Sequence, residues 1–127
     1  MTRTPSMAGV LDGAMGARLK GLRVMLPARV ETYDADRREV SAQPLILEGF
    51  TGEGGDRETE RLPVITGVPV IMPGSGGVRI KFPVTVGDTV MLVFSSSSLD
   101  AWLARGGEVD PQDERRHCLA DAVAIPG

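Results

Sequence analysis

The alternation of apolar and polar positions is clearest between residues 62 and 102, where it predicts three strands. The first, over 62–72, is rich in valine and isoleucine, whose branched side chains fit a pleated sheet better than a helix. After a glycine-rich turn, the second strand alternates apolar with basic residues, which is typical of a strand with one buried and one solvent-exposed face. Its predicted core face consists of Val78, Ile80 and Phe82.

The third strand of this region, over 88–95, is apolar on both faces. One face, which we expect to lie in the core, comprises Val90, Leu92 and Phe94. Met91 and Val93 occupy the other face, so a sheet covered on one side only would leave them in water. We expect the cover to be either a short helix over 99–104 or another copy of the chain.

Residues 1–22 are predicted to form an amphipathic helical extension at the N-terminus. Its apolar residues recur at helical spacing on one face, which we interpret as a docking surface: Leu11, Met15, Leu19 and Leu22. Glycines in the same stretch each weaken the helix by roughly 1 kcal/mol relative to alanine. The helix therefore needs a partner surface, which is either its own barrel, a neighbouring subunit or another protein.

The remaining strands are predicted upstream and at the C-terminal end. Strands over 23–33 and 39–47 form a hairpin. In the second of them, the inward residues are Val40, Ala42 and Ile46. Residues 48–60 are polar, glycine-rich and acidic, and are predicted to form a mobile loop. The last apolar segment spans 117–125, and we expect the barrel to fold without residues 122–127.

Together these elements predict an all-β fold with a small helical content. About five short strands favour a partly open, five-stranded barrel of the oligonucleotide/oligosaccharide-binding (OB) type over residues 23–127, with a short helix after its last core strand. The composition agrees, because 16 glycines and 9 prolines imply many turns. With only three Phe, one Tyr and one Trp, the core is left to Val, Leu, Ile and Met. A chain of 127 residues forms one such barrel.

The charge and the cysteine content limit which kinds of partner and which cellular compartment we expect. The net charge of −3 is spread along the chain without a basic patch, which disfavours a nucleic-acid partner. Cys118 is the single cysteine, so no intrachain disulfide forms, which suits synthesis in a reducing cytoplasm. The longest apolar run is interrupted by prolines and is too short for a membrane span, so stable membrane insertion is not expected.

Residues that perform catalysis or bind metals are few. His117 and Cys118 are the only imidazole and thiol, and as neighbours in an extended segment they point to opposite faces. The acidic residues of 48–60 lack the fixed spacing of a calcium loop, and one histidine with one cysteine is too few for a zinc site. We therefore expect a protein that is not an enzyme and that uses no metal and no cofactor.

Three segments within residues 23–127 occur in a distinctive order: LPARVETYDADRREVSAQP, LPVITGVPVIMPGSGGVRIKFPVTVGDTVMLVFSSSSLDAW and RRHCLADAVAIPG. Short steps within them are specific in combination, among them Phe82-Pro83 with Gly87-Asp88, Asp100-Ala101-Trp102 and Ile125-Pro126-Gly127. This succession resembles the N-terminal OB-fold domain of the central spike proteins of phage tail baseplates, the membrane-puncturing family. The resemblance implies a homotrimeric structural collar in the virion tail, made in the host bacterial cytoplasm, that joins the baseplate hub to a cell-puncturing tip.

The end of the chain departs from that family. There, a β-helical spike, often with a His-x-His iron-binding tip, follows the barrel, whereas this chain ends at Gly127 with one histidine. We expect the tip to be a separate polypeptide or distal tail component; alternatively, the protein plugs the tail without piercing anything. Under threefold association the predicted subunit contacts are the residues with too little cover in a single copy: Met91, Val93, Val123 and Ile125.

An alternative from another functional class is an OB-fold module that binds single-stranded nucleic acid or an oligosaccharide. Such modules need exposed aromatic side chains for stacking and, for nucleic acid, a basic groove. Tyr33, Phe50 and Trp102 are the candidates, but they lie far apart in the sequence. Trp102 is better explained as the anchor of its helix. The native mass discriminates between the two hypotheses, because only the collar requires a trimer.

Overall fold

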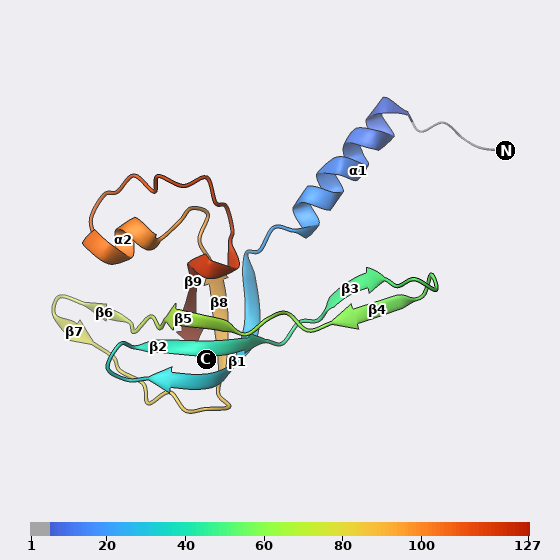
Figure 1. The fold of residues 1–127 in the computed structure, drawn as a ribbon. Coiled ribbons are helices and arrows are strands. Elements are labelled where there is room, and N and C mark those ends of the chain that lie inside the picture. The colour runs from blue at the N-terminus through green and yellow to red at the C-terminus, as the bar shows by residue number, and fades with distance from the viewer. Residues whose placement is uncertain (1–5) are drawn as a thin grey trace.

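The computed structural model describes residues 6–127, and a strongly curled five-stranded sheet forms its centre (Figure 1). In spatial order the strands, each antiparallel to its neighbour, are β5 (Ile65–Pro69), β2 (Glu39–Pro44), β1 (Met25–Asp34), β8 (Thr89–Phe94) and β9 (Ala122–Pro126). Just beyond β5, Val70 forms a parallel bridge to Ala124, and the Ile71 N–H donates to the Ala124 carbonyl at 2.9 Å. This bridge connects the two edges of the curled sheet at one point and gives a partly open barrel, so the predicted OB-like all-β fold is confirmed.

The core lies inside this curl and is almost entirely aliphatic. Successive residues of a strand point to opposite faces, and the inward positions of the strands are buried. They are Ala28 and Val30 on β1, Val40 and Ala42 on β2, Ile65 and Val68 on β5, Val90, Leu92 and Phe94 on β8, and Ala122 and Ala124 on β9. The alanines leave room for the larger side chains of the facing strands, which a small barrel requires.

The last strand belongs to this core, which corrects the expectation that the barrel folds without residues 122–127. Strand β9 pairs with β8 from Ala122 opposite Phe94 to Pro126 opposite Val90. Ala124 has no exposed surface. Removing these residues would therefore expose the core and leave the edge of β8 unpaired.

The second strand predicted within 62–102 does not belong to the sheet. Strand β5 covers only part of the predicted strand 62–72, and the chain then forms a small hairpin of β6 (Gly74–Ser75) and β7 (Val78–Arg79). The expected core face is wrong, because Val78, Ile80 and Phe82 are 72%, 57% and 45% exposed. Strand β9 takes the fifth place in the barrel instead.

The acidic segment 48–60, predicted to be a loop, is also a hairpin. Strand β3 (Glu48–Thr51) pairs antiparallel with β4 (Arg57–Glu60) in a separate two-stranded sheet. The turn between them includes Gly55 at a φ of 80°, a conformation that glycine adopts without strain. Ile46, predicted to face inward, lies beyond the end of β2 and is half exposed.

Two helices lie outside the barrel. Helix α1 (Met7–Lys20) begins after Ser6, whose Oγ accepts the Gly9 N–H at 3.0 Å and so caps its first turn. Within the described chain no residue of α1 is buried, so the helix does not pack on its own barrel. The first five residues of the predicted extension 1–22 lie outside the described residues.

The second helix, α2 (Asp100–Arg105), does not cover strand β8. None of its residues is buried within residues 6–127, although one of our two hypotheses placed it over the second face of that strand. Trp102, predicted to anchor the helix, is about half exposed. The apolar residues on the second face of β8 therefore remain without a cover from α2.

Candidate functional site

The structure brings the four predicted interface residues together on the outer face of the barrel. In the β8–β9 pairing, Met91 lies opposite Ile125 and Val93 lies opposite Val123. Strand β1 extends this apolar face, because Met25 pairs with Val93 and Pro27 pairs with Met91. We term the resulting surface the outer stripe; it consists of Met25, Pro27, Met91, Val93, Val123 and Ile125.

The outer stripe is apolar and yet accessible to solvent. Met91 is 36% exposed and Ile125 is 41% exposed, while the inward residues of the same strands fill the core. A sheet that is apolar on both faces is typical of one that is covered twice. Contiguous exposed apolar residues mark interaction sites, so the outer stripe is suited to pack against another apolar surface.

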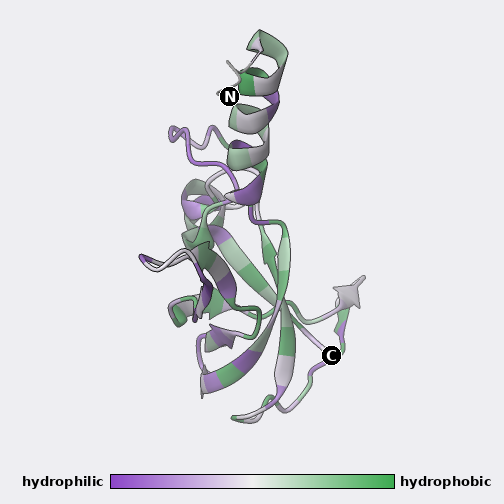
Figure 2. Cartoon of the chain, turned by 90° about the vertical axis from the view of Figure 1, so that its right-hand side faces the viewer, coloured by the Kyte–Doolittle hydropathy of each residue, from purple (hydrophilic) through white to green (hydrophobic). Residues whose placement is uncertain are grey.

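The residues of the predicted docking helix lie apart from the outer stripe. Figure 2 shows α1 standing clear of the barrel, with apolar and polar residues along its length. All four predicted docking residues are exposed, with Leu11, Met15 and Leu19 on α1 and Leu22 beyond its end at Lys20. Apolar and polar side chains are not separated onto opposite faces of α1, so the prediction of an amphipathic helix is wrong. A lone helix of this length is marginal in water even for favourable sequences, and glycines weaken it further. Helix α1 is therefore suited to packing on a surface outside this chain.

Arg23 joins α1 to the barrel. Its Nη1 donates to the Lys20 carbonyl at 3.5 Å, and its Nη2 forms an ion pair with Glu48 of β3 at 3.2 Å. The Arg23 carbonyl lies 2.8 Å from His117 Nδ1, and because a carbonyl only accepts, Nδ1 is the donor. His117 has a φ of 49°, so it does not lie in the extended segment that we predicted.

A buried aspartate organises the connection between β8 and β9, and sequence reasoning missed it. Asp121 ends the short 3-10 helix η1 (Leu119–Asp121). Its Oδ1 accepts from the Leu99 N–H at 3.1 Å and from Arg115 Nη2 at 3.0 Å. The same Arg115 nitrogen donates to Asp100 at 3.0 Å. These bonds fix the point at which β9 begins, and with it the C-terminal part of the outer stripe.

The charge of Arg115 is stabilised by this arrangement. Desolvation lowers the pKa of the guanidinium, but the hydrogen bond to Asp100 and the charges of the neighbouring carboxylates outweigh it and raise the pKa above its ordinary value. The cation therefore persists over the whole physiological pH range. No sequence signal marked the cluster, because charged residues in a turn are usually solvated.

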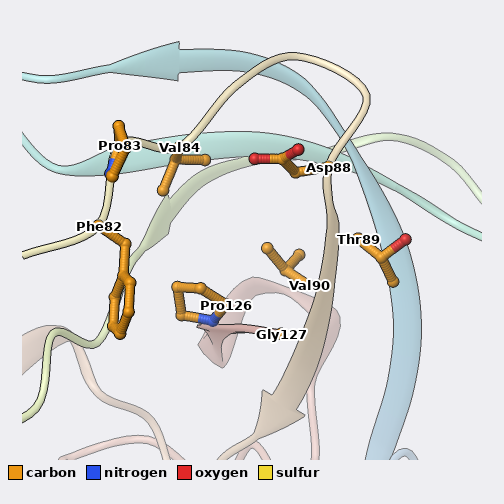
Figure 3. Close-up of a pocket in the computed structure, with 8 residues that line it drawn as sticks. All are labelled: Phe82, Pro83, Val84, Asp88, Thr89, Val90, Pro126 and Gly127. Carbon is orange, nitrogen blue, oxygen red and sulfur yellow. The ribbon is translucent and has the colours of Figure 1, made fainter.

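A pocket of about 330 Å³ lies where the chain approaches β8 and where β9 ends (Figure 3). Its lining is largely apolar: Phe82, Pro83, Val84, Val90 and Pro126, together with Asp88, Thr89 and Gly127. Asp88 Oδ2 accepts the Thr85 N–H at 2.9 Å, so the carboxylate shapes the turn before β8. Catalytic pockets combine several convergent polar groups, and this lining offers one titratable side chain.

The described chain was also searched for metal-ion sites and for membrane-spanning helices. Residues 6–127 contain no cluster of three or more side chains that could hold a metal ion. Over the same residues, the helices are too short or too polar to cross a bilayer.

Comparison with known proteins identifies a family. A family model described as the phage protein Gp138 N-terminal domain matches residues 26–127. This range contains the five barrel strands from the second residue of β1 onwards and leaves α1 outside. A search of curated proteins finds none that matches the chain.

Proposed function

The chain belongs to the family of the phage protein Gp138 N-terminal domain, and from this premise we propose that it forms a trimeric collar in a phage tail. Membership of the family makes it a phage protein with a structural role in the virion. The proposal adds a position and an oligomeric state. Three copies surround the tail axis and join the baseplate hub on one side to a cell-puncturing tip on the other.

The outer stripe is the observation that best supports a homotrimer. Two separate sequence arguments, a strand apolar on both faces and an apolar C-terminal segment, converge on residues that the β8–β9 pairing places opposite each other. Burying such a surface favours association by about 25 cal/mol for each Å² of apolar area removed from water. Closed threefold symmetry covers three stripes at once and leaves no open end for further growth.

The remaining exposed elements provide contacts along the axis. Helix α1 leaves the barrel at Arg23, and its apolar side chains are suited to a groove in the hub or in a neighbouring subunit. The end of β9 at Pro126 provides the opposite attachment point, where the collar meets the distal part of the tail. The role is mechanical and involves no turnover.

The mass of the purified chain under native conditions tests this function. We expect a species of three times the 13.5 kDa chain mass, because three stripes must be buried together. Sedimentation equilibrium over a range of concentrations gives the same information in solution. A chain that stays monomeric at roughly 50 µM would overturn the collar, since a stable structural trimer assembles at that concentration.

A further inference from the structure

The β3–β4 hairpin is a strongly acidic arm, which we define as residues 48–60. It contains five carboxylates against the single arginine Arg57, a formal charge of −4. Five apolar residues at or on the arm are between 42% and 51% exposed. Phe50 lies on β3, and the others lie at the root of the arm: Leu45, Ile46, Leu47 and Val64. The arm therefore combines an apolar patch with a negatively charged rim.

The segment that includes the β6–β7 hairpin is a basic arm, which we define as residues 71–82. Its charged residues are Arg79 and Lys81, without any carboxylate. They alternate with the exposed apolar residues Val78, Ile80 and Phe82. The Ile80 N–H donates to the Pro73 carbonyl at 2.7 Å, so the two sides of the arm remain paired beyond the short strands.

The neighbourhood of the basic arm includes charges of both signs. Arg38 lines a pocket together with β6 and β7. Asp34 and Asp36 belong to the same β1–β2 turn, but Asp34 Oδ1 already accepts two backbone N–H groups of that turn, at 3.0 and 3.2 Å. Asp36 and Arg38 also line a pocket with Lys81 of the arm. The turn 34–38 contains two aspartates and two arginines, so its net charge is zero and the net positive charge comes from the arm itself.

Contacts with the rest of the chain hold each arm only at its root, through the Arg23–Glu48 ion pair in the acidic arm and the hydrogen bond from the Ile71 N–H to the Ala124 carbonyl in the basic arm. An isolated two-stranded hairpin is marginal in water without a surface to pack on. In the acidic arm, Glu48 and Glu60 lie directly opposite each other, a like-charge pairing that destabilises the hairpin. In the basic arm, the strict alternation that normally specifies a buried face leaves its apolar side in solvent. Each arm has the properties of a surface that another molecule covers.

The two arms cannot cover each other within one chain. The acidic arm leads into β5 at Ile65, and the basic arm begins just after β5 ends at Pro69. Figure 1 shows the two hairpins pointing away from opposite ends of that strand. Their charges and apolar patches are nevertheless complementary, with a negatively rimmed patch on one side of the molecule and a positively rimmed one on the other.

We propose that the acidic arm of one copy docks on the basic arm of the next copy, so that three copies close into a head-to-tail ring. This inference rests on the proposed homotrimer and names the contact that builds it. Two different surfaces meet at each junction, and a rotation that returns to the start after three steps gives a closed ring. The outer stripe lies on β1, β8 and β9, so it remains free to be buried at the same time.

Charge reversal tests the contact in the full chain. One variant combines Glu58→Arg with Glu60→Arg, and another combines Arg79→Glu with Lys81→Glu. Each variant places like charges across the junction. We expect the protein concentration at which the trimer dissociates to rise about tenfold or more relative to the wild type. The four substitutions together restore opposite charges and should return dissociation to near the wild-type concentration.

A matched control changes the same number of charges outside the arms. Glu108→Arg with Glu114→Arg reverses two exposed carboxylates of the connection after α2 and should leave the trimer unchanged. Circular dichroism of every variant confirms that the barrel is folded. If either arm variant assembles as the wild type does, or if the fourfold variant fails to recover, the arm contact is wrong.

Cysteine crosslinking distinguishes a ring from a pairwise exchange of arms. In a Cys118→Ser background, Thr59→Cys on β4 and Ser75→Cys on β6 place one thiol on each arm. A ring produces covalent dimers and trimers on oxidation, whereas a twofold dimer that exchanges both arms stops at covalent dimers and would overturn the proposal. If the wild-type chain is a trimer but the cysteine variant forms no crosslinks, only the arm contact is wrong. If the wild-type chain is a monomer, the collar itself is wrong.

Discussion

At the scale of single residues, the clearest structural device is the buried carboxylate of Asp121. It accepts a hydrogen bond from the Leu99 backbone and pairs with Arg115, so it connects the chain after β8 to the start of β9. Charge-assisted hydrogen bonds of this kind are stronger than neutral ones, and a buried partner left alone is costly. One side chain therefore positions the last strand of the barrel.

We predict that Asp121→Ala lowers the free energy of unfolding by about 1–3 kcal/mol, because it leaves the Leu99 N–H without its acceptor and removes the buried acceptor of the Arg115 guanidinium. Chemical denaturation followed by circular dichroism measures the change. The control is Asp113→Ala, which removes another partner of Arg115 that is 40% exposed and should cost less than about 1 kcal/mol. Equal losses in the two variants would show that burial of Asp121 does not matter.

At the scale of elements, the outer stripe arises from the register of three strands. The β8–β9 and β1–β8 pairings place its residues side by side, and a shift of one residue would turn them into the core. The same alternation that fills the barrel therefore creates the second apolar face. The core and the proposed contact surface are two consequences of one register.

We predict that Met91→Lys combined with Val93→Lys yields a folded monomer, because two charged side chains cannot be buried against a neighbouring stripe. Size-exclusion chromatography with light scattering measures the mass. Thr32→Lys combined with Thr66→Lys is the matched control, since it adds the same charge at exposed positions of β1 and β5 and should leave the mass unchanged. A double lysine variant of β8 that keeps the wild-type mass would exclude the outer stripe from the contact.

The sequence was sufficient to predict the strands whose apolar face is buried by the rest of the same chain. The inward residues of β8 were predicted correctly, as were Val40 and Ala42 on β2, because their alternation corresponds to burial in the same molecule. The alternation at Val78, Ile80 and Phe82 is just as regular, but these residues are exposed, and periodicity alone does not say whether the cover comes from the same chain. The β3–β4 hairpin was missed because glycine and charge dominate its composition, although four residues on each side are enough for pairing.

At the scale of the whole molecule, the charge is separated rather than uniform. The acidic arm has a formal charge of −4 and the basic arm a charge of +2, while the full chain has −3. This separation is suited to a contact between the two arms of neighbouring copies, whereas a nucleic-acid groove requires a continuous positive surface. The aromatic side chains do not compensate. Tyr33 packs against the core, Phe50 lies on the acidic arm, and Trp102 belongs to α2.

Because of this charge distribution, we predict that the chain does not bind single-stranded nucleic acid with sub-micromolar affinity. Nonspecific binding depends on lysine and arginine contacts to several phosphates, and stacking depends on aromatic rings arranged along one groove. Here the basic arm offers two cations, and the three candidate rings lie on three separate elements. Fluorescence anisotropy with labelled poly-dT and poly-rU oligonucleotides at about 150 mM salt measures the affinity. The Glu58→Arg and Glu60→Arg variant serves as the comparison, because removing negative charge should strengthen any residual electrostatic binding. A sub-micromolar Kd for the wild-type chain would instead favour an OB-fold module that binds nucleic acid over the proposed collar.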